Sequence, residues 1–269
     1  MEIIELAPRV IYYKGIIENA DEVVKFLEEK NEDPLINQIL PPWEVWWDGR
    51  QEDDGYTWVP DQTRGYLKNL NWDKHINFFA ESSRRFPHVQ LSADDYTDAH
   101  KAIKPIVDSI DVPLTSAVRD YCDRYDVIYP QSISKNYHFR KYDVGGSVGP
   151  HQDQSGPELN MDHSILIYLN DDYNGNDFTF HDLDITFKPE KGSILIFNSD
   201  QVHSTTELEE GQAKYYIPFF WHSHEYQIVC FREKEFMLKM ALEDLDITIE
   251  EALAGAIPAD WRETRGHTP

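Results

Sequence analysis

Short apolar runs alternate with turn residues between positions 134 and 226, and this rhythm limits what the chain can fold into. The apolar runs are candidate strands at 135–143, 163–170, 177–181, 184–188, 193–198 and 214–222. The turn residues between them are Gly145-Gly146, Asn174-Gly175-Asn176, Lys191-Gly192 and Glu210-Gly211. Short strands at this spacing predict an antiparallel sandwich or barrel, because strands of a parallel sheet would alternate with helices.

Helical patterns flank the strand-rich segment on both sides. Residues 8–18 predict a strand, after which the capping-box pattern Asn19-x-x-Glu22 predicts the start of a helix. Residues 94–126 have helical patterning, which we expect Pro105 and Pro113 to interrupt. Two further helices are predicted after position 230, at 233–245 and from 248 onward. The predicted fold class is therefore mainly β with flanking helices (α+β).

No linker separates two cores, so we expect one domain over 1–269. Residues 1–133 would support the core, 134–226 would form it, and 227–269 would be a helical extension. Residues 41–63 are rich in tryptophan, acids and turn formers, which predicts a loop or a pair of short strands. This segment is a candidate substrate lid, although its composition fits a segment packed against the barrel equally well.

Acidic residues dominate the charge balance, with 49 Asp and Glu against 25 Lys and Arg, for a formal net charge of −24. This field disfavours nucleic acid and anionic membranes, which bind through basic side chains, and leaves a basic peptide or a small anion easier to accommodate. The two cysteines are too few for a disulfide framework. We see no signal peptide and no membrane-length apolar run, so we expect a soluble, cytoplasmic protein.

One spacing indicates metal chemistry. His151 and Asp153 lie two positions apart next to a candidate strand, and residues i and i+2 of an extended chain share a face. His203 ends another candidate strand and offers a third ligand. Two imidazoles and one carboxylate leave open positions on a metal, as in non-haem Fe(II) oxygenases. A His-x-Asp pair alone arises often by chance, so the surrounding motifs decide whether this pair is interpreted as a metal site.

Those motifs resemble a known family. Residues 142–153, which contain Gly145-Gly146 and Pro150-His151-Gln152-Asp153, closely resemble the Tyr-x-x-Gly-Gly…Pro-His-x-Asp stretch of prolyl 4-hydroxylase-like Fe(II)/2-oxoglutarate dioxygenases. Residues 164–170, 173–180 and 189–197 are similar to later strands and turns of the same family. The agreement covers about 90 positions, 135–224. One departure is Asn176, which stands where the family has the second glycine of a Gly-Gly turn.

The resemblance implies a double-stranded β-helix, or jelly roll, as the core of a single oxygenase domain. It implies that His151, Asp153 and His203 bind Fe(II), with 2-oxoglutarate and O2 as cosubstrates and ascorbate as a candidate reductant. Lys214 would bind the distal carboxylate of 2-oxoglutarate, unless a one-residue slip puts Tyr215 there. Tyr142 and Tyr168 would donate hydrogen bonds to the cosubstrate, and no catalytic residue is expected beyond the metal centre.

The function implied by the resemblance is hydroxylation of an unactivated C–H, most of all in a prolyl residue of a peptide or protein, with release of succinate and CO2. Three side chains are candidate substrate contacts: Trp43, Trp58 and His222. Two alternatives stay open. One is an oxygenase of a free amino acid, another small metabolite or, less favoured by the acidic charge, an alkylated nucleobase. The other is a non-catalytic jelly-roll binding protein.

Overall fold

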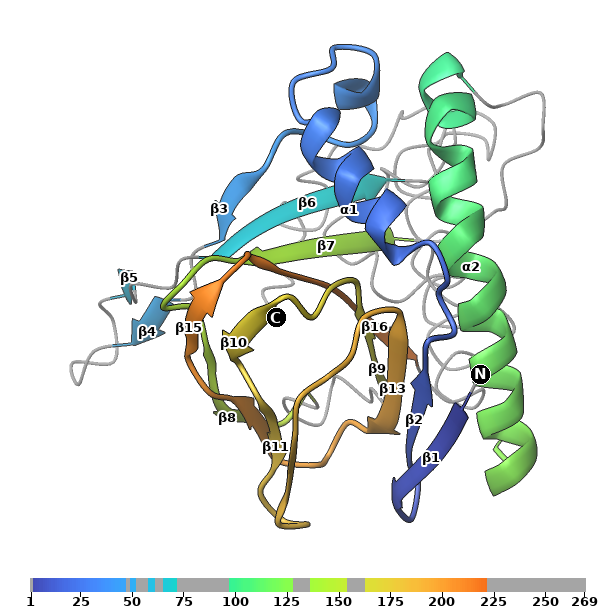
Figure 1. Ribbon diagram of the computed structural model, residues 1–269, viewed down its shortest axis with the longest axis vertical. Coiled ribbons are helices and arrows are strands. Elements are labelled where there is room, and N and C mark those ends of the chain that lie inside the picture. Colours follow the sequence, from blue (N-terminus) through green and yellow to red (C-terminus); the bar gives the residue numbers. More distant parts are fainter. Residues whose placement is uncertain are drawn as a thin grey trace, which may run out of the picture.

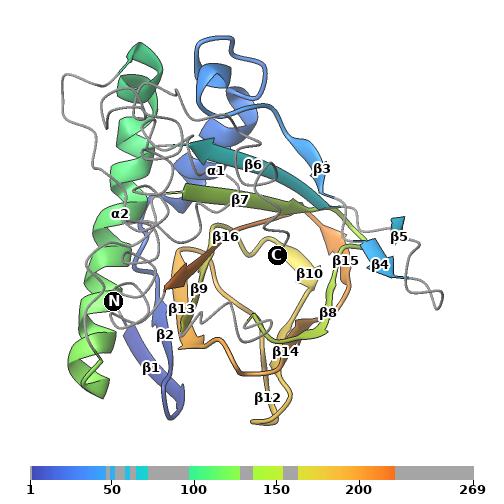
Figure 2. The same ribbon diagram turned by 180° about the vertical axis from the view of Figure 1, so that it is seen from behind.

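A ring of strands with helices along its outside is the main feature of the computed structural model (Figure 1). It describes residues 2–46, 49–51, 58–60, 65–71, 97–127, 136–153 and 163–221. Helix α1 (Ala20–Glu29), helix α2 (Asp98–Tyr125) and the 3₁₀ turn η1 (Ile36–Gln38) lie outside the ring (Figures 1 and 2). Among the described helices, none has both the length and the apolar character needed to cross a bilayer.

The large sheet has antiparallel neighbours throughout its described part. Its strands in spatial order are β1 (Glu2–Ala7), β2 (Val10–Lys14), β13 (Ser193–Asn198), β9 (His163–Tyr168), β16 (Lys214–Trp221), β7 (Asn136–Tyr142), β6 (Gly65–Asn71) and β3 (Glu44–Trp46). Strands β9, β13 and β16 form one wall of the ring (Figure 1). The large sheet therefore joins the N-terminal strands to the strand-rich segment.

The opposite wall is built from shorter strands. They are β12 (Ile185–Phe187), β11 (Phe178–Phe180), β14 (His203–Thr205) and β8 (Val148–His151) in spatial order, with a separate pair of β10 (Tyr173–Gly175) and β15 (Leu208–Gly211). A third small pair joins β4 (Gly49–Gln51) to β5 (Trp58–Pro60). Two facing antiparallel walls make a jelly roll, so the predicted fold class, mainly β with a double-stranded β-helix core, is confirmed.

Alternation along the central strands separates two apolar cores. In β9, Ile165 and Ile167 belong to the helix-side core, whereas Leu166 and Tyr168 belong to the barrel core between the two walls. Strands β2, β13 and β16 alternate in the same way. Because both faces of these strands are buried, their sequences are nearly continuous apolar runs, which explains why they are visible in the sequence.

All six strands predicted between 134 and 222 are present as β7, β9, β11, β12, β13 and β16. Four short strands, β8, β10, β14 and β15, were not predicted. Their sequences, such as Val-Gly-Pro-His in β8 and Leu-Glu-Glu-Gly in β15, contain glycine, proline or charged residues and lack an apolar run. The pairing with a neighbouring strand therefore determines their conformation more than their own composition does.

Helix α2 corrects one expectation. Pro105 and Pro113 lie inside a continuous helix of 28 residues instead of interrupting it. Each proline removes a backbone hydrogen bond, at a cost of about 3 kcal/mol. One face of α2, which includes Ile103, Ile110 and Leu114, is buried in the helix-side core. Each such side chain contributes roughly 1.5–3 kcal/mol, so packing outweighs the prolines.

The N-terminal region differs from its prediction in three details. The strand expected at 8–18 is present as the shorter β2, and an additional strand, β1, precedes it across a turn at Arg9, a residue with a left-handed φ of 64°. Asn19 is the N-cap residue of α1, but its side chain makes no capping hydrogen bond. Within 41–63, β3 joins the large sheet and β4 pairs with β5, while other residues of this segment lie outside the described residues. The helices predicted after position 230 lie outside them too.

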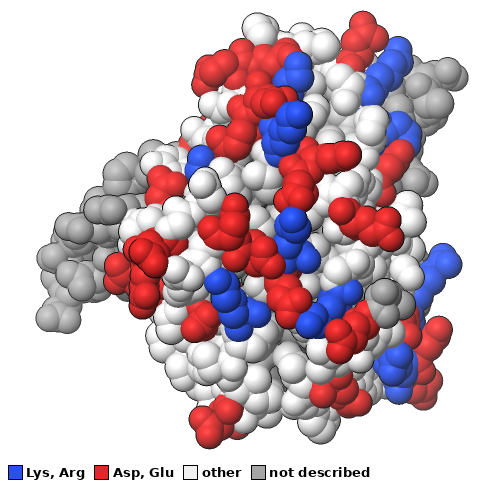
Figure 3. All heavy atoms as spheres, viewed as in Figure 1, with Lys and Arg blue, Asp and Glu red and all other residues white. Residues whose placement is uncertain are grey.

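Acidic side chains are spread over the face of the molecule seen in Figure 3, with Lys and Arg side chains scattered among them. On the described part of this face, the basic side chains form no continuous patch. A phosphate backbone would meet no basic stripe here.

Substitutions in the helix-side core should lower the free energy of unfolding more than substitutions at exposed positions. Ile167 is fully buried in β9, so Ile167→Ala should lower the free energy of unfolding by about 2–5 kcal/mol through lost burial and a cavity. The matched control is Val112→Ala on α2, where the side chain is 70% exposed and the expected change is within about 0.5 kcal/mol. Urea unfolding of both variants measures the change in the free energy of unfolding. Equal losses of stability in the two variants would contradict the placement of Ile167 in a buried core.

Candidate active site

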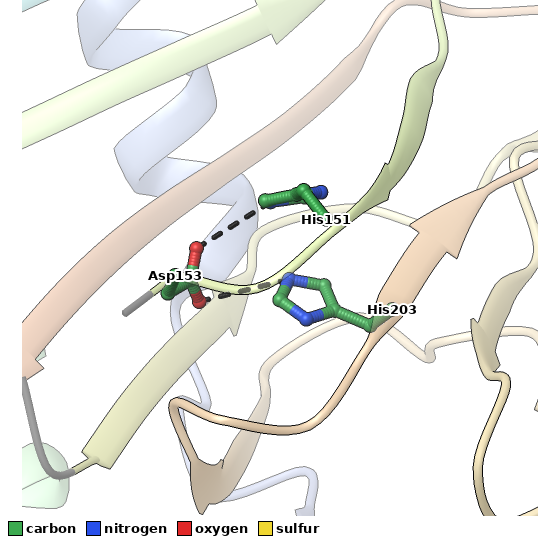
Figure 4. A group of neighbouring side chains, drawn as sticks. All are labelled: His151, Asp153 and His203. Carbon is green, nitrogen blue, oxygen red and sulfur yellow. Dashed lines mark ion pairs between the residues drawn. The ribbon is translucent and has the colours of Figure 1, made fainter. Parts of the chain in front are cut away.

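Three side chains from two paired strands converge at one end of the barrel. His151 ends β8, Asp153 follows two residues later, and His203 begins β14. Strands β8 and β14 are antiparallel neighbours, and their register places His203 directly opposite His151. One ligand atom from each of the three residues lies within 4.8 Å of the others (Figure 4). The structure therefore brings together the three predicted metal ligands.

Hydrogen bonds orient both imidazoles toward Asp153. Nδ1 of His151 lies 2.9 Å from the Gly149 carbonyl oxygen, and Nδ1 of His203 lies 2.9 Å from the Gln201 carbonyl oxygen. Because a carbonyl only accepts, each Nδ1 donates a hydrogen bond, which leaves Nε2 as the ring nitrogen that faces Asp153. The Nε2 atoms lie 3.4 and 3.6 Å from the two Asp153 oxygens. Such backbone partners are typical of metal-binding histidines.

Asp153 is held as a carboxylate. Burial raises its pKa, but the hydrogen bond from His151, the nearby His203 imidazole and the hydroxyl of Ser164 lower it, and the net shift is downward. Ser164 Oγ donates to Asp153 Oδ2 at 2.6 Å and also lies 2.8 Å from Ser199 Oγ. This pair of buried hydroxyls orients the carboxylate and leaves it ionised, which is the form that binds metal.

Aromatic rings enclose His203. Phe178 stacks on its imidazole with centroids 5.2 Å apart, and Phe197 packs edge-on at 5.0 Å. Burial lowers the pKa of His203, so the imidazole is neutral at neutral pH. The side chain of His151, by contrast, is 39% exposed. The cluster is closed around His203 and open on the side of His151.

Two imidazoles and one ionised carboxylate, converging and partly open, fit a divalent iron ion. Harder ions such as Mg²⁺ and Ca²⁺ prefer all-oxygen sites, and structural zinc sites have four protein ligands. Among the described residues, this is the one group of His, Cys, Asp and Glu whose atoms converge in this way.

A second polar feature lies in the barrel core around Lys214 at the start of β16. Its side chain is only 2% exposed, and its ammonium donates to Asn176 Oδ1. The rings of Tyr168, Tyr173 and Tyr216 lie 5.2–6.0 Å from Nζ. Burial lowers the pKa of Lys214 to about 7, against a smaller opposing effect of Asp177. Among the described residues, no carboxylate forms an ion pair with this lysine.

Two phenols beside Lys214 have hydroxyls with no hydrogen-bond partner among the described residues. They belong to Tyr168 and Tyr173, and both are buried. A buried hydroxyl without a partner costs free energy, so a missing acceptor is indicated. One ammonium and two phenol donors fit a carboxylate. Tyr173 was not identified from the sequence, because it lies in a polar turn segment and only the fold shows that its hydroxyl is buried.

Tyr142 lies opposite Lys214 in the pairing of β7 with β16, but its hydroxyl has other partners. Its hydroxyl accepts a hydrogen bond from Tyr216 at 3.1 Å, and the two rings stack. Arg140 hydrogen-bonds to both tyrosines. The prediction that Tyr142 contacts the cosubstrate therefore stays a prediction, whereas the geometry offers Tyr168 and Tyr173 as unpaired donors.

The alternative anchor, Tyr215, points the other way. It belongs to the helix-side core, and its hydroxyl donates to Glu28 Oε1 at 2.9 Å. Trp43 lies beside it, with ring centroids 6.1 Å apart, and donates from Nε1 to the same Glu28 oxygen. Trp43, expected to contact substrate, thus packs on the helix side of the large sheet, because its indole N–H finds a partner on α1. The Trp58 side chain and His222 lie outside the described residues.

The topology and the three converging side chains define the class of protein: a double-stranded β-helix with a His-Asp-His cluster that fits iron. Residues 137–222 match the family model of the 2OG-Fe(II) oxygenase superfamily. The resemblance found in the motifs is confirmed at this level, and the superfamily implies Fe(II), 2-oxoglutarate and O2. No curated protein sequence matches the chain.

Several solved structures are similar in fold. A viral collagen prolyl hydroxylase from Paramecium Bursaria Chlorella virus-1, in complex with 2OG, is 11% identical over 80% of this chain and 95% of its own, with a TM-score of 0.46. A prolyl hydroxylase from Trichoplax adhaerens, bound to a hypoxia inducible factor peptide, is 11% identical over 82% and 86%, with a TM-score of 0.48. A 2OG-Fe(II) oxygenase family oxidoreductase from Burkholderia pseudomallei is 15% identical over 80% and 85%, with a TM-score of 0.45.

The converging cluster gives a direct prediction. His151→Ala and His203→Ala should each lose stoichiometric Fe(II) binding, because the remaining two ligands hold the ion too weakly. Both variants should stay folded by circular dichroism. Anaerobic iron analysis after desalting measures the loss.

The matched control is His181→Ala, since His181 is an exposed histidine whose Nε2 contacts Ser204 Oγ at 2.9 Å. It should keep its iron. Full iron retention by either cluster variant would show that these residues are not the ligands.

Burial of Lys214 predicts a stability that depends on pH. Its folded pKa is about 7, below the ordinary value of 10.5, so the unfolded state binds more protons between these values and stability rises with pH there. Lys214→Met removes this cost. Without cosubstrate, the variant should be more stable than the parent by on the order of 1–3 kcal/mol at pH 7, and the advantage should shrink toward pH 10. Chemical unfolding at several pH values measures both; an advantage that does not change with pH would contradict the assignment.

Proposed function

We propose that this chain is a Fe(II)- and 2-oxoglutarate-dependent dioxygenase that hydroxylates a prolyl residue of a peptide or protein. One observation carries the cofactor part: a single barrel holds a His-Asp-His cluster and a buried lysine with two unpaired phenols. The first fits the metal and the second fits the distal carboxylate of the keto acid.

The chemistry is divided between the bound groups and the chain. Fe(II) with 2-oxoglutarate and O2 supplies oxidation of an unactivated C–H, with succinate and CO2 as coproducts. His151, Asp153 and His203 hold the metal. Lys214, with Tyr168 and Tyr173, holds the distal carboxylate and so sets the orientation of the cosubstrate. No residue has to act as a general base.

The surroundings of the cluster determine how substrate approaches. Phe178, Phe180 and Phe197 pack around His203 and exclude water from that side. The open side is at His151, so the substrate carbon enters there. Exclusion of water around the metal limits side reactions while the substrate is bound.

The substrate assignment comes from the motif at residues 142–153, which resembles prolyl 4-hydroxylases. A prolyl residue in an extended or polyproline II segment presents its ring outward and fits an open rim. The formal net charge of −24 favours a basic peptide over an acidic one. Ascorbate is proposed as the reductant that restores Fe(II), and free amino acids and other small metabolites are the competing substrates.

The test begins with an anaerobic titration of the Fe(II)-loaded protein with 2-oxoglutarate. A saturable visible charge-transfer band, absent from His151→Ala, is expected. The protein is then given O2, ascorbate and a panel of peptides, each paired with a copy in which proline is replaced by alanine. We expect a mass increase of one oxygen atom only in the proline-containing members, together with succinate release.

Each contrary result would contradict one part of the proposed function. Iron binding without the band would rule out the keto-acid complex. The band with oxygen added to free amino acids, but to no peptide, would replace the substrate class. The band with no product from any candidate would leave a protein that binds the keto acid without turnover.

A further inference from the structure

Asn176 has a buried side chain in the turn between β10 and β11. It is fully buried, and its φ of 53° lies in the left-handed region, which asparagine tolerates better than most residues. The preceding Gly175 also has a positive φ, of 71°, and an added Cβ there would clash with the Glu207 carbonyl oxygen. The turn is therefore tightly packed, and a polar side chain inside it needs partners.

The amide of Asn176 has three partners. Nδ2 donates to the carbonyl oxygens of Gly146 and Thr206, each at 3.1 Å, while Oδ1 accepts from the Lys214 ammonium. Carbonyls only accept and an ammonium only donates, so these partners allow one orientation of the amide. Its oxygen faces Lys214.

The partners of this amide belong to the segments that carry the metal ligands. Gly146 lies two residues before β8, which ends at His151, and Thr206 directly follows β14, which begins at His203. The backbone N–H of Leu208 also donates to the Gly146 oxygen, at 2.9 Å, so the two segments are joined there. One side chain thus links Lys214 to both strands of the His-Asp-His cluster.

We propose that Asn176 is a positioning residue for the cosubstrate: it holds the Lys214 ammonium at a set place relative to the metal ligands. The inference rests on the proposed function. A lysine has a long, flexible stem, and an acceptor that restricts it reduces the ordering needed when the carboxylate binds. A neutral amide does this without neutralising the charge, which stays available for the cosubstrate.

Two substitutions separate the positioning of the Lys214 ammonium from the effect of a charge beside it. Asn176→Gly removes the acceptor and the two donors, and glycine accepts the positive φ. Asn176→Asp keeps an oxygen toward Lys214, adds a negative charge and loses the donors. Both should weaken 2-oxoglutarate binding, by about 10-fold or more, the first through lost positioning and the second because its carboxylate competes with that of the cosubstrate.

The pH dependence distinguishes positioning from general damage. Binding needs protonated Lys214, so affinity falls as pH rises through the pKa of the free lysine, about 7 in the parent protein. Loss of the acceptor in Asn176→Gly lowers that pKa and moves the midpoint to lower pH. The added carboxylate in Asn176→Asp raises it and moves the midpoint to higher pH. Misfolding would not shift the two midpoints in opposite directions.

The other groups that face Lys214 are the same in the parent and in both Asn176 variants, so they do not explain opposite shifts of the pH midpoint of binding. They are Asp177 from the same turn, Tyr168 on β9, Tyr173 on β10, Tyr216 on β16 and Tyr142 at the paired position of β7. Burial raises the pKa of Tyr168 and of Tyr173, so both phenols stay protonated from pH 6 to 9. The metal ligands are the same in all variants.

The experiment is calorimetric titration of Mn(II)-saturated protein with 2-oxoglutarate at pH values from 6 to 9. The matched control is Asn174→Ala, an exposed asparagine of the same turn that donates to Glu210, and it should bind like the parent. Thermal unfolding checks that each variant is folded; Asn176→Asp carries the test alone if Asn176→Gly does not fold.

The outcomes separate the two proposals. No binding of 2-oxoglutarate by the parent protein overturns the proposed function and this inference together. Normal binding by the parent with unchanged affinity and midpoint in the Asn176 variants overturns the inference and leaves the proposed function standing. Weaker binding with unmoved midpoints assigns Asn176 a structural role only, and also overturns it.

Discussion

Burial of the central strands on both faces is the constraint on which the rest of the structure depends. Strands β2, β9, β13 and β16 pack one set of side chains against the helices and the alternate set into the barrel. With a period of two, a slip of one residue would exchange the two sets. In β16 it would turn Lys214 toward α1 and put Tyr215 into the barrel. The apolar alternation therefore determines which polar side chain reaches the site.

The two walls of the barrel have different tasks. The short strands β8 and β14 carry the two histidines, while the large sheet contributes Lys214 and the hydroxyl that orients Asp153. Burial and hydrogen bonding give the metal-binding groups suitable protonation states before any ligand arrives, with Asp153 ionised and His203 neutral, whereas burial of Lys214 lowers its pKa and so disfavours the charged form that a carboxylate needs. The metal-binding groups are therefore preorganised in the folded chain before a ligand binds.

Sequence patterns predicted the parts of this protein that follow a simple period or a motif. The six apolar strands and the His151, Asp153 and His203 spacing are of this kind, and the structure brings those three residues together. Tyr173 was missed because its relevance is that a buried hydroxyl has no partner, which only tertiary packing reveals. Trp43 packs on the helix side of the large sheet, a placement that composition could not predict because it does not tell which face of a sheet an aromatic covers. The interruption of α2 predicted at Pro105 and Pro113 was wrong, because the burial of one helix face contributes more free energy than the two prolines cost.

The pairing of β2 with β13 has a consequence for how the protein is made. Tyr13 lies opposite Ile194, about 180 positions later in the chain, and β6 and β7 also join segments that are far apart. Such long-range pairings raise the contact order, which predicts slow folding. During synthesis, β2 can pair with β1 but lacks its second neighbour until β13 leaves the ribosome. The interval before this closure is when the nascent chain is most prone to aggregate, and when a chaperone would matter most.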